Sequence, residues 1–575
     1  MAKKTIADVL VELLVQADVK RVWGLPGDSL NGFTEALCRR DGIDWVGVRH
    51  EEVAAIAAAG EADAHGGLTA CAGSCGPGNL HLINGLFEAQ RAKVPMVAIA
   101  AQIPSSEIGL GYFQETHPQN LFRECSDFCE LVAHPAQVPQ VFGAAISSAV
   151  VNRSVSVIVL PGDVALAEAP PRSLHWQPPV QPVVVPPDDA LDAVAAHIDK
   201  AERIAILGGY GCHDAHDEVV QLAGKIKAPV VHALRGKQSL EYDNPYDVGM
   251  TGLIGFASGY KAMRECDLLL MLGTNFPYRD FYPEHGHIIQ VDIRGHHLGR
   301  RSSLTTGLVG DIGATLRALL PRLKEKSDDA FLEASRRHYA KAREGLDDLA
   351  TPRKPGQPLH PQYLTARVSA LADEDTVFTA DVGTPTVWAA RYIHMTRGRR
   401  LTGSFMHGSM ADAVPLAMGW QLAHPGRQVV ALAGDGGVMM LMGDLVTLVA
   451  EKMPVKVIVY NNETLGFVAM EMKAAGYLDE TTDNPPVDYA ALAGSLGMPG
   501  FKVTSSDQLD DTLKKAFAHD GPALVDVRTA KQELSMPPKI EAKQARGFSL
   551  YMLRAVMNGR GDQVIDLGKT NWWRR

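Results

Sequence analysis

Two apolar segments of the sequence each end in residues that can bind a metal ion and phosphate. The run at 429–433 stops at Gly-Asp-Gly-Gly (434–437), and the run at 455–460 stops at Asn461 and Asn462. If both runs are parallel strands joined by a helix, Asp435 and Asn462 meet at the carboxyl ends of neighbouring strands, where open α/β sheets bind ligands. Their oxygens, a loop carbonyl and two phosphate oxygens nearly complete the octahedron that Mg²⁺ requires. We therefore predict a magnesium–diphosphate site.

The glycines of this turn favour the same chemistry. Because they lack a Cβ, Gly434, Gly436 and Gly437 allow the backbone to approach a phosphate closely, and the helix expected after them directs its N-terminal dipole at the anion. Gly-Asp-Gly alone is typical of an ordinary turn. The asparagine pair at the end of the next apolar run favours the ligand site over a turn without a ligand.

A second candidate residue, Glu51, follows a short strand-like segment and opens an alanine-rich helix. Its neighbours are His50 and Glu52. Two acidic residues in the first turn of a helix are explained by their interaction with the helix dipole, and an isolated His-Glu-Glu indicates no more than that. A functional role for Glu51 therefore depends on the rest of the chain.

The Gly-Asp-Gly turn and the asparagine pair together resemble the diphosphate-binding motif of thiamine-diphosphate enzymes. The resemblance implies that Asp435, Asn462 and the carbonyl of Thr464 bind Mg²⁺. It also implies that Glu51 bonds the aminopyrimidine ring and promotes the imino tautomer through which the cofactor deprotonates its own thiazolium carbon. The family pattern places further cofactor contacts at Gly408, Ser409, Met410, Gly436, Gly437, Glu463, Leu465, Gly466, Phe467 and Val468.

Within the segment 408–410, the resemblance gives two residues particular roles. The carbonyl of Gly408 would accept a hydrogen bond from the cofactor amine, and Met410 would hold the cofactor in its bent shape. His50, His81 and His407 would line the cleft, with no role assigned beyond polarity. Because the cofactor bridges two subunits in this family, the resemblance implies a homo-oligomer, and we expect a tetramer.

Four further segments resemble the pyruvate oxidases, including the quinone-reducing pyruvate dehydrogenases of bacteria, more than acetolactate synthases or plain decarboxylases. They span 109–115, 233–255, 272–283 and 465–477. This resemblance implies bound FAD, contacted by Gly252, Leu253, Ile254, Gly255, Thr274, Asn275, Phe276, Pro277, Tyr278 and Asp292. The acid that ends a strand at 292 is a known nucleotide signal, although the GxGxxG fingerprint is absent. The same resemblance adds Phe113, Gln114, Phe467 and Glu471 to Glu51 as catalytic residues.

The implied activity is oxidative decarboxylation of pyruvate to acetate and CO₂, with thiamine diphosphate, Mg²⁺ and FAD as cofactors and ubiquinone as electron acceptor. Two alternatives within the enzyme class are a phosphate-dependent pyruvate oxidase and an acetolactate synthase-like carboligase. A non-catalytic member of the family is a third alternative. The presence of Glu51, Asp435 and Asn462 argues against it.

Helix-like and strand-like segments alternate along the sequence, and the elements that they form position these residues. This alternation predicts an α/β fold of three doubly wound parallel-sheet domains: a pyrimidine-binding domain at 1–183, an FAD-binding domain at 184–335 and a diphosphate-binding domain at 336–532. Seven prolines between residues 170 and 187 mark the first linker. A C-terminal tail at 533–575 differs in composition from all three domains.

The overall composition excludes several classes of protein. The net charge of -10, without a basic run interleaved with aromatics, argues against nucleic-acid binding. Seven cysteines without a CxxC pair favour a reduced, cytosolic setting over a disulfide framework. The N-terminus lacks the pattern of a signal peptide, and no segment of about 18 uncharged apolar residues predicts a membrane span.

The tail carries the opposite charge to the rest of the chain. Residues 539–575 hold eight Lys or Arg against three Asp or Glu, a net charge of +5. Helical spacing would place Phe548, Met552, Ala555 and Val556 on one face, and the chain ends with two tryptophans and two arginines. A basic amphipathic helix of this kind predicts peripheral binding to anionic phospholipid, here on the inner face of the cell membrane. The alternative is a tail packed on the protein's own surface, and each arrangement could belong to a different state.

Overall fold

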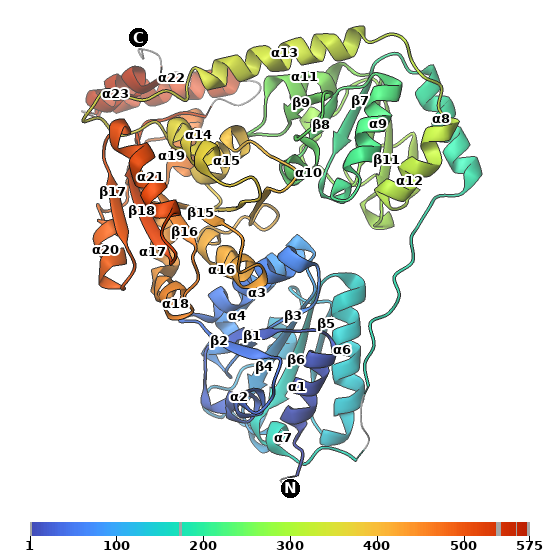
Figure 1. Ribbon diagram of the computed structural model, residues 1–575, viewed down its shortest axis with the longest axis vertical. Coiled ribbons are helices and arrows are strands. Elements are labelled where there is room, and N and C mark those ends of the chain that lie inside the picture. Colours follow the sequence, from blue (N-terminus) through green and yellow to red (C-terminus); the bar gives the residue numbers. More distant parts are fainter. Residues whose placement is uncertain (1–2, 172–174, 536–541, 559, 572–575) are drawn as a thin grey trace.

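The structure of the protein is a computed structural model that describes residues 3–171, 175–535, 542–558 and 560–571. Three parallel six-stranded sheets, each covered by helices, form three domains (Figure 1). This arrangement confirms the predicted α/β class with three parallel-sheet domains. Residues 175–187, between the first and second domains, run as an extended segment along one side of the molecule (Figure 1).

The first sheet has the strand order β2-β1-β3-β4-β6-β5. Its strands are β1 (Arg21–Gly24), β2 (Asp44–Gly47), β3 (Thr69–Gly73), β4 (Met96–Gln102), β5 (Phe128–Leu131) and β6 (Val155–Pro161). β3, β4 and β6 are buried throughout, because helices cover both faces of a parallel sheet. The covering helices are α1 (Ile6–Gln16), α2 (Asn31–Cys38), α3 (Glu51–His65), α4 (Pro77–Ala92), α5 (Pro118–Leu121), α6 (Val138–Asn152) and α7 (Gly162–Leu166).

The second sheet has the order β12-β11-β10-β7-β8-β9. Its strands are β7 (Ile204–Gly208), β8 (Val230–His232), β9 (Asp247–Met250), β10 (Leu268–Leu272), β11 (His287–Asp292) and β12 (Thr306–Val309). The helix at Ile312–Leu319 gives way to a 3-10 turn at Leu320–Arg322, because Pro321 has no N–H to donate to a continuing helix. The helices are α8 (Asp188–Lys200), α9 (His216–Ile226), α10 (Lys237–Leu240), α11 (Ala257–Glu265), α12 (Ile312–Leu319) and α13 (Ala330–Asp347).

The third sheet has the order β14-β13-β15-β16-β18-β17. Its strands are β13 (Val377–Ala380), β14 (Arg400–Gly403), β15 (Val429–Gly434), β16 (Lys456–Asn461), β17 (Gly500–Val503) and β18 (Ala523–Arg528). Its helices are α14 (Pro361–Leu371), α15 (Thr384–Tyr392), α16 (Ala413–Ala423), α17 (Asp435–Leu441), α18 (Leu445–Ala450), α19 (Gly466–Ala475), α20 (Tyr489–Ser495) and α21 (Leu509–Phe517). β15 and β16 are hydrogen-bonded neighbours, as the motif required.

The first and third domains meet where α3 crosses α16 (Figure 1). Two glycines make this crossing close. A Cβ on Gly60 would lie 2.5 Å from the carbonyl oxygen of Leu416, and one on Gly419 would lie 2.0 Å from that of Ala57. No side chain fits at either position, so the small residues determine how closely the two domains pack.

The tail forms helices α22 (Ala542–Met557) and α23 (Gly561–Asn571). α22 packs on α19, with Tyr551 and Ala555 fully buried, whereas Leu553 and Met557 are 59% and 77% exposed. The predicted single apolar face is therefore wrong: Ala555 is buried and Val556 is exposed. One face of the helix packs on the protein and a second apolar face is open.

Two further features concern the chain as a whole. No helix within the described part of the chain is long and apolar enough to cross a membrane. All seven cysteines are free thiols, and five of them are buried in the first and second domains: Cys71, Cys75, Cys125, Cys212 and Cys266.

Candidate active site

Asp435 and Asn462 meet at the carboxyl edge of the third sheet. Asp435 is the first residue of α17, directly after β15, and Asn462 directly follows β16. The backbone N–H of Glu463, next to Asn462, donates a 2.6 Å hydrogen bond to Asp435 Oδ2. The N–H of Thr464 donates to Asn462 Oδ1 at 3.1 Å. The fold therefore brings the predicted ligand residues together in one turn-and-loop pair.

The carboxylate of Asp435 is almost completely buried. Its Oδ1 accepts hydrogen bonds from the N–H of Gly436 at 2.8 Å and from Asn484 Nδ2 at 3.3 Å. Burial nevertheless raises the pKa of Asp435 to about 6, because these dipoles do not fully replace the lost water. A divalent cation would favour the ionised form, and the carboxylate, amide and carbonyl oxygens present are the hard donors that Mg²⁺ prefers.

Three residues support this turn without having been predicted from sequence. Tyr489 Oη donates to the carbonyl of Asp435 at 3.0 Å, and Asn484 bonds its side chain. Asp381 accepts from the N–H groups of Ala413 and Gly434, both at 2.9 Å. A signal for Asp381 did exist, because it directly follows the apolar strand β13 and so lies at the same sheet edge. The sequence around Asn484 and Tyr489 carries no comparable signal.

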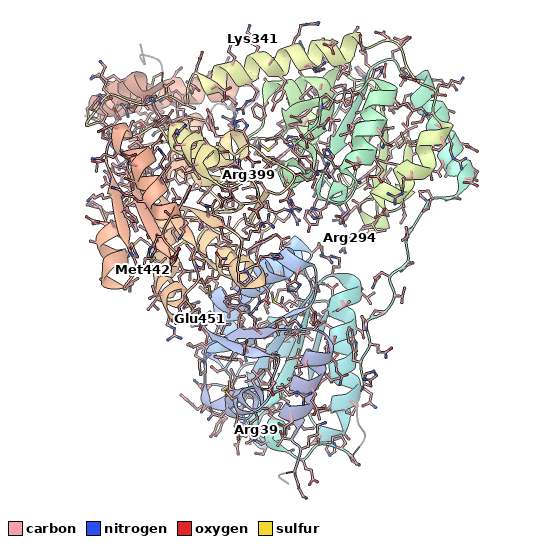
Figure 2. The ribbon with its side chains drawn as sticks, viewed as in Figure 1. Arg39, Arg294, Lys341, Arg399, Met442 and Glu451 are labelled. Atoms are coloured by element: carbon pink, nitrogen blue, oxygen red, sulfur yellow. The ribbon has the colours of Figure 1, made fainter. Side chains whose placement is uncertain are left out.

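The loop of residues 404–410 lies beside the turn. Gly408 adopts a left-handed φ of +93°, and a Cβ there would meet no atom within 4 Å. A Cβ on Gly436 would lie 3.5 Å from Met410 Cε, so the loop and the diphosphate turn are adjacent. Gly437, Asp381 and Met442 line a small hollow next to them, and Figure 2 shows where Met442 lies in the third domain. Open backbone beside a hollow is suited to a ligand.

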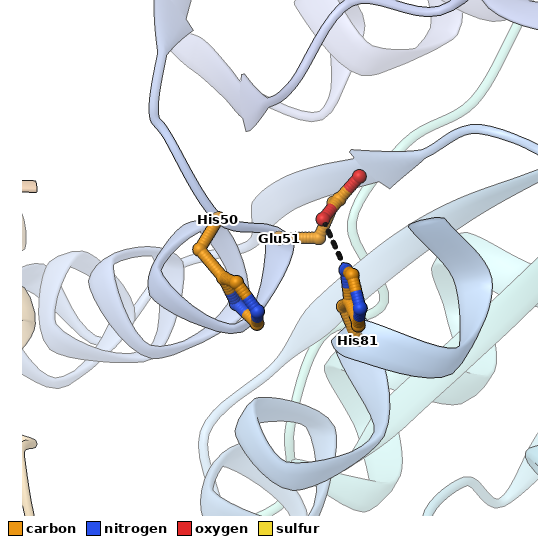
Figure 3. Close-up of side chains that lie close together, drawn as sticks. All are labelled: His50, Glu51 and His81. Atoms are coloured by element: carbon orange, nitrogen blue, oxygen red, sulfur yellow. Dashed lines mark hydrogen bonds and ion pairs between the residues drawn. The ribbon is translucent and has the colours of Figure 1, made fainter. Parts of the chain in front are cut away.

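Glu51 opens α3 in the first domain and is buried. His81, from α4, is hydrogen-bonded through Nδ1 to Glu51 Oε2 at 2.9 Å (Figure 3). His50 caps α3 by accepting from the N–H of Glu52 at 3.2 Å, and its ring stacks on that of His81 with centroids 4.4 Å apart. The histidines therefore have specific contacts with the glutamate and its helix, which their predicted polarity did not include.

His50, Glu51 and His81 also place three potential metal ligands within 4.8 Å of one another. The helix cap argues against a metal ion there. Because the lone pair of His50 Nδ1 accepts the Glu52 N–H, a neutral His50 carries its proton on Nε2 and has no second lone pair to offer. The cluster is better suited to holding the Glu51 carboxylate.

The other predicted catalytic residues lie on two exposed segments. Phe113 is 79% exposed, and Gln114, at φ +63°, accepts a weak hydrogen bond from Cys75 Sγ at 3.4 Å. Phe467 and Glu471 lie four residues apart on α19, with Glu471 exposed and Phe467 half-buried against the core of the third domain. Among the described residues, no hydrogen bond or ion pair joins Glu51 to Asp435.

The predicted flavin contacts gather after strands β9, β10 and β11. Gly252 has φ +106°, and a Cβ there would lie 3.5 Å from the rings of both Phe276 and Tyr278. Two buried polar atoms beside them, Thr251 Oγ1 and Asn275 Oδ1, lack a hydrogen-bond partner. Asp292 ends β11, where its Oδ1 accepts from the N–H of Arg294 at 2.8 Å. The remaining predicted contacts, Leu253, Ile254, Gly255, Thr274 and Pro277, lie in the same two loops.

Comparisons with known proteins agree with the three-domain architecture. Family models for the N-terminal, central and C-terminal domains of thiamine pyrophosphate enzymes match residues 4–121, 191–319 and 381–527. A putative thiamine pyrophosphate-containing protein of Bacillus subtilis is 37% identical over 573 residues, which cover 99% of each chain.

Two relatives have more specific names. The pyruvate oxidase of Lactiplantibacillus plantarum is 29% identical over 532 residues, which cover 90% of this chain and 87% of that protein. The large subunit of acetolactate synthase isozyme 2 from Escherichia coli is 30% identical over 543 residues, covering 92% and 96% respectively. The chain is thus similar along nearly its whole length to enzymes with two different reactions.

Proposed function

The chain belongs to the thiamine pyrophosphate enzyme family, and from this premise we propose that it oxidatively decarboxylates pyruvate to acetate and CO₂. In the proposed reaction, pyruvate and water yield acetate and CO₂ while two electrons pass to FAD and then to a membrane quinone, ubiquinone. The observation that carries the proposal is the buried Asp435, held beside Asn462 at the edge of the third sheet.

The residues present fit the first cofactor. Asp435, Asn462 and the carbonyl of Thr464 would hold Mg²⁺ and the diphosphate, and Gly408 and Met410 would receive the aminopyrimidine. Bound thiamine diphosphate would supply an electron sink for decarboxylation. The role of this chain is then to orient that cofactor and, through Glu51, to hold a proton at its aminopyrimidine ring.

The residues of the second domain fit a flavin. The unpartnered Thr251 Oγ1 and Asn275 Oδ1 offer polar contacts for a ligand, and the glycine at 252 lets the backbone lie close to the rings of Phe276 and Tyr278. Bound FAD would accept the electron pair and pass it to the quinone.

We also propose a homo-oligomer, as a tetramer. Leu110, Tyr112 and Phe113 expose apolar side chains on one loop, with Leu110 72% exposed. A solvated monomer rarely presents such a cluster. A second chain would cover it and, as the family resemblance implies, bring a Glu51 half-site to the Asp435 half-site.

The C-terminal tail supports a proposed location in the cytoplasm, bound peripherally to the inner face of the cell membrane. The net charge of +5 over residues 539–575 and the exposed Leu550, Leu553 and Met557 of α22 suit an anionic lipid surface. The terminal tryptophans, Trp572 and Trp573, lie outside the described residues.

Anaerobic mixing of the purified protein, loaded with thiamine diphosphate, Mg²⁺ and FAD, with pyruvate tests the proposal. We expect the flavin absorbance to bleach in the absence of phosphate and to return when a quinone analogue is added, with acetate as product. Lack of bleaching would contradict the flavin step.

Acetolactate synthase-like carboligation is the second candidate, because an acetolactate synthase matches over most of both chains. The same mixture distinguishes it: acetolactate would accumulate while the flavin stays oxidised. A phosphate-dependent oxidase would require phosphate and form acetyl phosphate.

A further inference from the structure

One face of α4 reaches from the first domain onto the loop of residues 404–410 in the third. Asn84, Phe87 and Glu88 lie three and four residues apart, so their side chains leave the helix on the same side. Phe87 stacks on the ring of His407 with centroids 5.6 Å apart and planes inclined by 13°. This loop contains Gly408 and Met410, the proposed aminopyrimidine contacts.

Asn84 uses its whole amide in this contact. Its Nδ2 donates to Glu52 Oε1 at 2.7 Å and to Ser409 Oγ at 2.9 Å, and its Oδ1 accepts from His407 Nε2 at 2.8 Å. Burial lowers the pKa of His407, which keeps the ring neutral and suited to donate a single proton. One side chain thus links the neighbour of Glu51 with two residues of the loop.

Glu88 reaches the beginning of the same loop. Its carboxylate accepts a hydrogen bond from the hydroxyl of Ser404, and both residues are buried. Ser404 Oγ in turn accepts from the backbone N–H groups of Gly408 at 3.1 Å and Ser409 at 2.9 Å. Because both N–H groups point inward at Ser404, the Gly408 carbonyl that follows is held in a defined direction.

We propose that Asn84 and Glu88 are positioning residues that hold the 404–410 loop in the shape that receives the aminopyrimidine half of the cofactor. The proposal rests on the proposed function, since that function assigns the aminopyrimidine to this loop. Within the described part of the chain, neither residue forms a hydrogen bond or ion pair with the Asp435 turn, so we expect their effect to be confined to the organic half of the ligand. The diphosphate and Mg²⁺ are expected to bind independently of them.

Asn84→Asp tests the role of the amide without changing its shape. A carboxylate at this position has no hydrogens to donate and faces Glu52 and Ser409 Oγ with like partial charge. We expect the dissociation constant for thiamine diphosphate to rise about tenfold and thiazolium proton exchange, followed by NMR after acid quench, to slow about tenfold. Affinity for Mg²⁺ with inorganic diphosphate should stay within about twofold of the natural protein.

Ser404→Ala is the second variant, because it removes the oxygen that orients both loop N–H groups and changes little volume. It should reproduce the exchange defect even if Asn84→Asp folds poorly. Gln90→Ala is the matched control and should behave as the natural protein, because Gln90 lies on the same helix and, among the described residues, no hydrogen bond joins its side chain to the loop.

The outcomes separate this inference from the proposed function. If both variants fold and their thiazolium proton exchange is as fast as in the natural protein, the positioning role is overturned and the proposed function stays intact. Equal weakening of inorganic diphosphate would also overturn it, because it would show general damage to the site. If the natural protein itself binds no thiamine diphosphate, the proposed function fails, and the positioning role fails with it.

Discussion

Glu51 is the residue whose chemistry is most open to a direct test. Glu51→Gln keeps the size of the buried side chain but removes the carboxylate proposed to hold a proton at the aminopyrimidine ring. We expect thiazolium proton exchange to slow by a factor of about 100 or more, the usual scale of a lost acid–base group. Exchange measured by NMR after acid quench gives the result. Mg²⁺ and inorganic diphosphate should bind as before, and an unchanged exchange rate would rule out the assignment.

Glu88 predicts a pH dependence of stability. Burial raises its pKa to about 7 from an ordinary value of 4.5. Its contribution to stability is therefore complete below about pH 4.5 and is lost as pH rises through 7, because the unfolded chain releases the proton more easily. Relative to Glu88→Gln, the natural protein should lose about 1 kcal/mol between pH 6 and pH 8. Thermal melting of both proteins at the two pH values measures this, and parallel pH profiles would contradict it.

α19 joins the cofactor site to the tail, and Phe467 lies in its first turn. If this aromatic side chain lies near both cofactors, as in the family resemblance, Phe467→Ala should slow flavin reduction by pyruvate about tenfold or more through lost positioning. The affinity for pyruvate should change less. Stopped-flow bleaching at several pyruvate concentrations separates the two effects. Tyr477→Ala, an exposed aromatic just beyond the helix, is the control.

The crossing of α3 and α16 depends on glycine. A Cβ on Gly419 would overlap the backbone of α3, at 2.0 Å from Ala57 O and 2.5 Å from Glu61 N. Gly419→Ala should therefore destabilise the docked domains by about 3 kcal/mol, at the upper end of typical overpacking. Gly426→Ala, where a Cβ would meet no atom within 4 Å, is the matched control. Equal melting temperatures for the two variants would contradict the prediction, because they would show that α3 and α16 can move apart without loss of stability.

The docked tail connects the membrane proposal with the whole molecule. Arg554 donates to the carbonyl of Gly476 at 2.7 Å, and Tyr551 lies against Lys473 of α19, its ring centroid 5.5 Å from Nζ. The structure therefore shows the alternative considered from the sequence, a tail packed on the protein's own surface. Both arrangements are compatible if the tail leaves α19 in a second state. Because coupling between two sites is reciprocal, pyruvate and lipid would then each favour the binding of the other.

Deleting residues 553–575 should abolish sedimentation with anionic phospholipid vesicles. Each basic residue near the surface contributes about 1 kcal/mol, an attraction that salt screens. The full-length protein should sediment more strongly with pyruvate and less strongly as salt rises. The truncated protein should keep its activity with a soluble electron acceptor. Salt-insensitive sedimentation that is equal for the two proteins would refute the membrane role.

The sequence by itself determined the fold class and much of the candidate site. Asp435 and Asn462 could be paired because each ends an apolar run, and the ends of neighbouring parallel strands share one edge. Glu51 could be placed at the start of a helix from its neighbours alone. In each case the signal is local, because it consists of the pattern of apolar and polar residues over a short segment and of the position at which that pattern ends.

Tertiary structure decided the contacts between distant segments. The bonds from Asn84 to Ser409 and from Tyr489 to Asp435 join residues far apart in the chain, and no local pattern encodes such a meeting. The tail shows the same limit. Its helical period was readable, but which face is buried depends on the surface of α19, where a Cβ on Gly547 would lie 2.1 Å from Ala474 O. Periodicity specifies an element, whereas the partner that covers it is selected by packing across the whole molecule.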